Sequence, residues 1–462
     1  MAPALGAAGQ PNILFIFADD LSYEMVHATG NSRIITPNLD RLATSGMVFT
    51  HAYNMGSWSG AVCVASRTML NTGRFVWHAE RVYHTAEKER QAGRFWSEYL
   101  KRAGYETYMT GKWHIQANAQ KAFNHVVHVR PGMPRTVPQA YNRPIEGQPD
   151  QWHPWDKKFG GFWEGGKHWS EVLADDATAF LQQAARSDKP FFMYLAFNAS
   201  HDPRQSPKKY VDMYPQATME VPANFLPEYP FQNFIGCGPG LRDERLAPFP
   251  RTPYAIRVHR SEYHALTTHM DVQIGRILKA LEATGKADNT WIFFTADHGL
   301  AVGHHGLMGK QNQYDDSVRV PFFVVGPGVP KGRKLDAPIY LQDVMPTTLE
   351  LAGVPRPGHV EFHSLLPFIR GQRTNSFYPA IYGGYLKFQR MITMDGWKLI
   401  LYPKVPKARL FNLKEDPLEQ HDLSDRPEQK ARMKRLFAEF RKLQAQTGDT
   451  LDCASVFPEL AN

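Results

Sequence analysis

The first three quarters of the chain alternate short apolar runs with longer amphipathic stretches, and this alternation constrains the fold more than any other feature. The run Ile13–Phe17 leads into a helical stretch that Pro37 opens and Gly46 closes, as expected of proline near a helix start and glycine past its end. Parallel strands that are buried on both faces read as continuous apolar runs, and helices connect them. We therefore expect an α/β fold in which helices cover both faces of a mostly parallel central sheet. Further helix–strand pairs are predicted at 95–102 with 105–110, at 172–181 with 191–197, and at 263–281 with 291–295.

The pattern changes after about residue 375, where short apolar runs come before a single amphipathic helix. A chain of 462 residues also exceeds the size at which one hydrophobic core stops growing. We predict a large domain over 1–374 and a small C-terminal α+β subdomain with a short antiparallel sheet over 375–462. The subdomain's strands are expected at 380–382, 391–393 and 397–402 and its helix at 428–443.

Two irregular segments interrupt the alternation within the large domain, at 115–168 and 222–258. Both are rich in proline and in aromatic or basic side chains, and neither shows a clear period. Long irregular loops in compact domains are usually functional or disordered, and the aromatic content argues against disorder. We expect these segments to select the ligand.

The charge balance of the chain is basic. The formal net charge is +8, which suits an anionic ligand, although it would also serve solubility alone. No stretch approaches ~18 consecutive apolar residues, and residues 1–10 lack the basic and apolar regions of a signal peptide. We expect neither a membrane span nor a nucleic-acid partner. The three cysteines lack CxxC spacing, so no zinc site is expected, and a Cys237–Cys453 disulfide is left open.

Reactive side chains follow four of the predicted strands, at the edge where open α/β sheets bind ligands. The carboxylates of Asp19, Asp20 and Asp297 would repel one another unless a cation lay among them. Oxygen ligands suit a hard ion such as Ca²⁺, or Mg²⁺ in a tighter octahedral site. An isolated Asp-Asp pair is more often a helix cap, but here it is joined by a second acidic strand end. The four endings are Asp19-Asp20, Gly111-Lys112-Trp113-His114, Asn198-Ala199-Ser200-His201 and Asp297-His298-Gly299.

Cys63 lies at the predicted start of a helix that Gly73 closes. Backbone N–H groups at a helix start stabilise an anion, and Arg67, one turn further on, could pair with an anion held by residue 63. A single cysteine is most often an inert buried side chain. The combination of Cys63 with Arg67 makes a reactive role worth testing.

With this motif the sequence resembles the type I, formylglycine-dependent sulfatases of the alkaline phosphatase superfamily. Their signature is Cys-x-Pro-Ser-Arg or Cys-x-Ala-Ser-Arg, and here it reads Cys63-Val64-Ala65-Ser66-Arg67. The resemblance covers nearly the whole chain and implies an alkaline-phosphatase-like fold. Further matches are Pro11 to Asp20, Thr36 to Asp40, Gly111-Lys112-Trp113-His114, His201, Ala296-Asp297-His298-Gly299, Gly309-Lys310, Leu410 to Leu413 and Asp416-Pro417.

The resemblance also implies a role for each matching residue. A maturation enzyme would oxidise Cys63 to formylglycine, whose hydrate is the nucleophile, with Arg67 and His114 holding and deprotonating it. Ala65 replaces the more frequent proline of the signature, which some maturation enzymes accept less well. The resemblance further implies that Asp19, Asp20, Asp297, His298 and residue 63 bind calcium, and that Lys112, His201 and Lys310 grip the sulfate and its bridging oxygen, with His201 as general acid.

The substrate expected from the two irregular segments is a sulfated carbohydrate, either a polysaccharide or its oligosaccharides. Tryptophan rings stack on sugars, while arginine and histidine recognise further acidic groups. Such a substrate favours a periplasmic or secreted enzyme. The alternatives are an aryl or choline sulfatase, a phosphate or phosphonate ester hydrolase, and a non-catalytic sulfate-binding relative. The candidate loop residues are His125, His128, Arg130, Trp152, His153, Trp155, Trp163, His168, Arg242 and Arg245.

Overall fold

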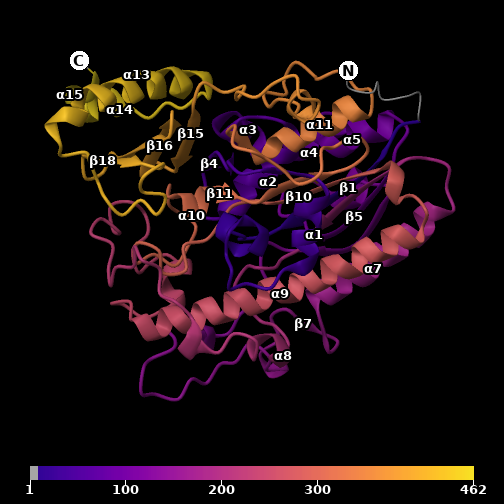
Figure 1. Ribbon diagram of the computed structural model, residues 1–462, viewed down its shortest axis with the longest axis horizontal. Helices are drawn as coiled ribbons and strands as arrows, with labels where there is room; N and C mark the ends of the chain where they lie inside the picture. Colours follow the sequence, from indigo (N-terminus) through magenta and orange to yellow (C-terminus); the bar gives the residue numbers. More distant parts are fainter. Residues whose placement is uncertain (1–8, 462) are drawn as a thin grey trace.

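The computed structural model describes residues 9–461, and within them a large mixed sheet forms the centre of the molecule (Figure 1). β1 (Asn12–Ala18) lies in its middle, pairs in parallel with β10 and β9, and is buried along its whole length. β12 runs antiparallel to both of its neighbours, whereas the other neighbouring pairs are parallel, which confirms the mostly parallel sheet. The strand order is β13 (Arg333–Leu335), β2 (Met47–Phe49), β12 (Phe322–Val325), β10 (Thr290–Ala296), β1, β9 (Phe191–Ala196), β5 (Glu106–Lys112) and β6 (His125–Arg130).

Helices pack on both faces of this sheet, as the sequence predicts. α1, α7 and α9 contact one another or the strands on one side, and α2, α5 and α11 form a contacting group on the other (Figure 1). The α-helices are α1 (Pro37–Ser45), α2 (Val62–Thr72), α3 (Val76–Tyr83), α4 (Ala86–Gln91), α5 (Trp96–Arg102), α6 (Ala119–Ala122), α7 (Trp169–Ala185), α8 (Lys208–Val211), α9 (Pro253–Ala283), α10 (Asp315–Val318), α11 (Val344–Leu351), α12 (Leu366–Ile369), α13 (Lys430–Gln446), α14 (Cys453–Val456) and α15 (Pro458–Ala461).

The C-terminal part of the chain builds a second, smaller sheet against which α13 packs. Its four consecutive strands are antiparallel, as expected, but a fifth strand comes from the beginning of the chain. This strand, β4 (Gly56–Ser57), pairs in parallel with β15 and lies only a few residues before Cys63. The sheet order is β18 (Lys407–Asn412), β17 (Trp397–Tyr402), β16 (Gln389–Met394), β15 (Ile381–Tyr385) and β4.

Short strands complete the fold. β3 (Ala52–Tyr53) pairs with β11 (Arg319–Val320) and β14 (Ile339–Tyr340), and β7 (Trp163–Glu164) pairs with β8 (Lys167–His168). The hydrophobic core around the second sheet joins Met69 and Trp77 to Leu399 and Phe440, so its residues come from both sides of the predicted 374/375 boundary. That boundary itself stays a prediction.

The sequence analysis did not place every element, and among those it missed are β2, β12 and β13 of the large sheet. The segment 115–168 contains β6, which the sequence analysis left without a strand because its alternating His and Val residues form a partly exposed edge. α9 begins at Pro253, inside the segment 222–258, because Thr252 caps it by accepting the N–H of Ala255. β18 was also not predicted.

Two further expectations concern the membrane and the cysteines. Within residues 9–461, no helix combines the length and apolar character needed to cross a bilayer. Cys237 and Cys453 are both buried and free, so the disulfide left open by the sequence is not formed. Residues 1–8, where the sequence shows no signal peptide, lie outside the described part of the chain.

Candidate active site

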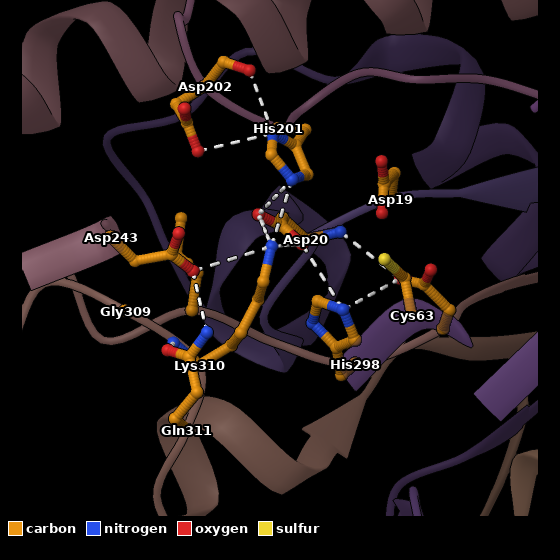
Figure 2. A network of polar contacts seen from close by, with 12 residues as sticks. Asp19, Asp20, Cys63, His201, Asp202, Asp243, His298, Gly309, Lys310 and Gln311 are labelled. Atoms are coloured by element: carbon orange, nitrogen blue, oxygen red, sulfur yellow. Dashed lines mark hydrogen bonds and ion pairs between the residues drawn. The ribbon is translucent and has the colours of Figure 1, made fainter. Parts of the chain in front are cut away.

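The site lies at the carboxyl ends of four parallel strands of the large sheet. The register pairs Ala18 of β1 with Ala296 of β10, so Asp19-Asp20 and Asp297-His298 emerge side by side. β5 and β9 deliver Lys112 and His201 to the same edge. The sequence analysis therefore placed these strand ends together correctly, and Figure 2 shows several of these side chains pointing toward one another.

Four buried ligand atoms gather at this edge, one each from Asp19, Cys63, Asp297 and His298, all within 4.8 Å of one another. Asp19 Oδ1 and His298 Nε2 make no hydrogen bond within residues 9–461. His298 Nδ1 donates to the carbonyl oxygen of Gly299 at 2.9 Å, which leaves Nε2 as the ring nitrogen facing the carboxylates. Lone pairs that lack a donor, carried by carboxylates and an oriented imidazole, fit a divalent cation.

The charge distribution at these carboxylates is uneven. Burial, followed by the neighbouring Asp297 carboxylate, raises the pKa of Asp19 well above its usual range. Burial also opposes ionisation of Asp297, but His298 and Arg67 outweigh it and hold the pKa of that carboxyl below its usual range. A buried pair of acids is therefore only partly balanced by the protein's own cations, which is the condition a metal ion would relieve.

Cys63 stands near the start of α2, and its thiol is buried at the same edge of the sheet. Its Sγ lies 3.2 Å from His114 Nδ1. Burial would raise the pKa of the Cys63 thiol, but Lys112 and the contact with His114 outweigh burial and lower it well below the usual range. Arg67, one turn along α2, donates from Nε to Asp297 at 3.0 Å and from Nη1 to the Lys112 carbonyl oxygen at 2.8 Å.

Arg67 is therefore positioned differently from the expectation that it pairs with an anion at residue 63. Arg67 is fully buried, and its hydrogen bonds join Asp297 to the Lys112 backbone at the end of β5. Its Nη2 atom lies 3.9 Å from Asp19 Oδ1. Its Nη2 has no hydrogen-bond partner within the described residues. One donor thus stays available on a side chain that is otherwise fixed.

The other end of the site is a cluster of Asp20, His201 and Lys310. Lys310 Nζ lies 2.9 Å from His201 Nε2 and donates to both carboxylate oxygens of Asp20 at 3.0 and 2.9 Å (Figure 2). Lys112 makes the equivalent ion pair with Asp19. Each predicted lysine thus neutralises one predicted metal ligand and lies where an incoming anion would meet it.

Backbone conformation also marks the site. Asp20 and His114 both have a φ of 57°, in the left-handed region that non-glycine residues seldom adopt. Gly111, just before Lys112, has a φ of 95°, and a Cβ there would come within 1.9 Å of the Ala196 carbonyl oxygen. Strained conformations of this kind cluster at functional sites.

Sequence reasoning missed two contributors, Asp202 and Asp243. Asp202 lies 3.1 Å from His201 Nδ1 through Oδ1, and Asp243 lies 3.6 Å from Lys310 Nζ (Figure 2). Arg242 forms ion pairs with both aspartates and so connects the partners of His201 and Lys310. The position of Asp202 directly after His201 was a usable signal, but nothing in the segment 222–258 identifies Asp243.

Most of the loop residues expected to select the ligand have structural partners instead. His125, His128 and Arg130 pair with Glu106, Asp176 and Glu164 respectively. Trp152 and His168 are buried, and His168 caps α7. His153 and Trp155 stack on each other beside Arg143, and Trp163 lies under Lys157. Of the ten candidates, Arg242 is the one that these contacts connect to the site.

The arrangement of these side chains is suited to catalysing the hydrolysis of an ester. A buried nucleophile position, two lysines, an imidazole beside the nucleophile and another beside the second lysine surround one point. Fixed positive charge stabilises the oxygens of a compact tetrahedral anion in the transition state, and the imidazoles can move protons. Fold and site together define a hydrolase for esters of a tetrahedral oxyanion.

Comparison with known proteins makes the class specific. The family model described as Sulfatase matches residues 11–354, and the one described as N-sulphoglucosamine sulphohydrolase, C-terminal, matches residues 303–446. The chain belongs to the sulfatase family and is a sulfuric ester hydrolase.

Individual relatives span nearly the whole chain. It is 29% identical to an arylsulfatase of Clostridium perfringens over 92% of each protein. It is 25% identical to an N-acetylglucosamine-6-O-sulfatase of Bacteroides thetaiotaomicron, covering 95% of this chain and 87% of the relative. The solved phosphonate monoester hydrolase of Agrobacterium radiobacter shares the fold, with a TM-score of 0.75 at 20% identity over 95% of this chain and 96% of that one. The alkaline-phosphatase-like fold expected from the sequence is confirmed.

Proposed function

We propose that this sulfatase removes sulfate from a sulfated carbohydrate, with formylglycine made from Cys63 as nucleophile and calcium as its metal. The observation that carries the proposal is the convergence of Cys63, His114, His201 and Lys310 with the carboxylates at four strand ends. An N-acetylglucosamine-6-O-sulfatase among the relatives supports the substrate class.

Asp19, Asp20, Asp297 and His298, with residue 63, would hold the ion. Calcium, which suits oxygen-rich sites better than magnesium outside octahedral geometry, would polarise a sulfate oxygen and favour an anionic nucleophile when bound. Formylglycine requires a maturation enzyme that acts on Cys63. The burial of Cys63 means that this enzyme would act before the chain folds.

Two lysines and two histidines of the site would bind the sulfate and transfer the protons. Lys112 and Lys310 hold the sulfate oxygens, because ammonium groups match a compact anion. His114, which contacts the nucleophile position, takes up its proton. His201 lies next to Lys310 and donates a proton to the departing alcohol oxygen, which a poor leaving group needs.

The same residues would also serve other esters, so substrate must be tested directly. Parallel kinetics should compare 4-nitrophenyl sulfate, choline sulfate, 4-nitrophenyl phosphate, a phenylphosphonate monoester and sulfated oligosaccharides from glycosaminoglycan, carrageenan and ulvan. We expect the highest kcat/KM on one of the oligosaccharides. A higher value on choline or aryl sulfate, or on the phosphorus esters, would refute the carbohydrate assignment.

An extracellular polysaccharide as substrate and a calcium-rich environment together favour a periplasmic or secreted enzyme. Fractionation of the native host, followed by immunodetection, tests this proposal. Detection in the cytoplasm alone would contradict it.

A further inference from the structure

A cleft of about 540 Å³ opens between α3, the turn that joins β15 to β16, and the segment 448–452. This volume is within the usual range for small-ligand sites. None of the residues predicted to act in catalysis, to bind the sulfate or to bind the metal lines it.

The floor of the cleft is rigid. Arg390 makes two hydrogen bonds to Asp449, from Nε at 2.6 Å and from Nη2 at 2.8 Å, and its guanidinium lies 4.5 Å from the centre of the Trp77 ring. Tyr382 donates to the same carboxylate at 2.8 Å. The charges at the bottom therefore neutralise each other, and a ligand there needs no charge of its own.

The rim offers groups that are free to bind. Lys387 and Glu80 are exposed and make no hydrogen bond or ion pair within residues 9–461. Arg81 and Asp452 add one charge of each sign, so the rim carries two cationic and two anionic side chains. Trp58 and Phe388 supply half-buried aromatic surface. Balanced donors and acceptors beside aromatic rings suit a neutral sugar, which presents hydroxyl groups at its edge and C–H groups on its face.

The cleft is linked to the active site at both walls. Trp58 precedes Cys63 by five residues, a span of at most about 17 Å of chain. On the opposite wall, Phe388 is followed by Gln389, whose Nε2 donates to the Gln311 carbonyl oxygen at 2.7 Å. Gln311 directly follows Lys310. Through Gln389 and Gln311, the wall of the cleft is therefore joined to the residue next to Lys310.

We propose that this cleft is a subsite that binds an unsulfated sugar unit of the same substrate chain, through stacking on Trp58 and Phe388 and hydrogen bonds to Glu80 and Lys387. This inference rests on the proposed carbohydrate substrate. The subsite makes the enzyme prefer oligosaccharides over sulfated monosaccharides.

The test uses the Glu80→Gln/Lys387→Gln double variant, with Lys404→Gln as the matched control. Lys404 is an exposed lysine in the turn between β17 and β18, away from the cleft lining. For each protein, kcat/KM is measured on di-, tetra- and hexasaccharides of the sulfated series that the substrate panel identifies, and on 4-nitrophenyl sulfate as reference. The ratio of hexasaccharide to reference should fall about tenfold in the double variant and stay constant in the control.

A second measurement does not depend on turnover. Calorimetric titration of the wild type and the double variant with the chemically desulfated hexasaccharide should show binding that the double variant loses. An unchanged ratio in the double variant would overturn the subsite, and so would the absence of binding of the desulfated hexasaccharide to the wild type. Activity on 4-nitrophenyl sulfate without activity on any oligosaccharide would overturn both the subsite and the carbohydrate assignment. Equal kcat/KM of the wild type on the di-, tetra- and hexasaccharides would overturn only the subsite.

Discussion

At the scale of single residues, the site is a set of buried charges that constrain one another. Lys310 donates a hydrogen bond to Asp20 and contacts His201, and Arg67 donates a hydrogen bond to Asp297. All five side chains are almost fully buried. Removing one partner therefore leaves an uncompensated charge, so activity and stability should change together at most of these positions.

His201 is the exception, because its role is specific to the leaving group. A sugar alkoxide needs a proton in the transition state, whereas nitrophenolate leaves without one. His201→Ala should reduce desulfation of the oligosaccharide by ~10²–10⁴-fold and that of 4-nitrophenyl sulfate far less. The comparison of kcat/KM for the two esters decides the point. Equal losses would mean that His201 only binds sulfate.

Asp297 should be required for the effect of calcium. Asp297→Ala removes a proposed ligand and also the ion-pair partner of the buried Arg67, which keeps only Asp19 at 3.9 Å, so the free energy of unfolding should fall by about 3 kcal/mol or more. The wild type should gain thermal stability on addition of calcium, because the ion binds the folded state only, and the variant should lose that gain. Asp288→Ala, at an exposed aspartate just before β10, is the control. A calcium-dependent Tm that survives in Asp297→Ala would contradict the metal site.

At the scale of elements, the strand ends were predictable and the loops were not. Ile13–Phe17 reads as a buried strand, so the position of Asp19 at its end follows from the pattern alone. Asp243 lies near Lys310 because the irregular segment 222–258 brings it there. That segment has no clear periodicity, so its course could not be predicted from the sequence. β6 was missed for a related reason, since an edge strand lacks the continuous apolar run of a central one.

At the start of α11, one buried carboxyl group should make the stability of the protein depend on pH. Asp343 is buried at the start of α11, where it accepts the N–H of Tyr340, the N–H of His363 and the hydroxyl of Tyr378. Burial raises its pKa from 3.8 to about 7, although these hydrogen bonds oppose the shift. The folded protein therefore holds an extra proton between these two values, and the free energy of unfolding falls as pH rises through that window.

Asp343→Asn should remove this pH dependence. The stability of the wild type relative to the variant should fall by at least about 1 kcal/mol between about pH 5 and pH 7, since one pKa unit corresponds to about 1.4 kcal/mol. Urea unfolding at several pH values measures it, with the exposed Asp188→Asn as control. A constant difference between wild type and Asp343→Asn would show that Asp343 is ionised throughout.

At the scale of the whole molecule, the two sheets share residues that the sequence assigned to separate domains. β4 leaves the large domain to pair with β15, and it leads directly into the helix that carries Cys63. Lys398 of β17 is fully buried and pairs with Asp315 at 2.6 Å and Glu419 at 2.8 Å, and Asp315 lies five residues after Lys310. The small sheet therefore helps to fix both sides of the active site.

We accordingly expect the two parts to unfold as one. Lys398→Met leaves the buried Glu419 without its cation and Asp315 with only the more distant Arg319, and breaking a buried ion pair typically costs about 3–5 kcal/mol. Calorimetry should show a single transition in the wild type, displaced to lower temperature in the variant, while the exposed Lys430→Met stays at the wild-type Tm. Two separate transitions, only one of them displaced, would mean that the parts fold independently.

The central claim is that residue 63 works as formylglycine, and its most direct test is to relate modification to turnover. The protein is produced with and without a co-expressed maturation enzyme, and peptide mass spectrometry gives the fraction of Cys63 converted in each preparation. Turnover of the sulfate ester should rise in proportion to that fraction and vanish in Cys63→Ser. Full turnover by protein whose Cys63 is entirely thiol would contradict the account.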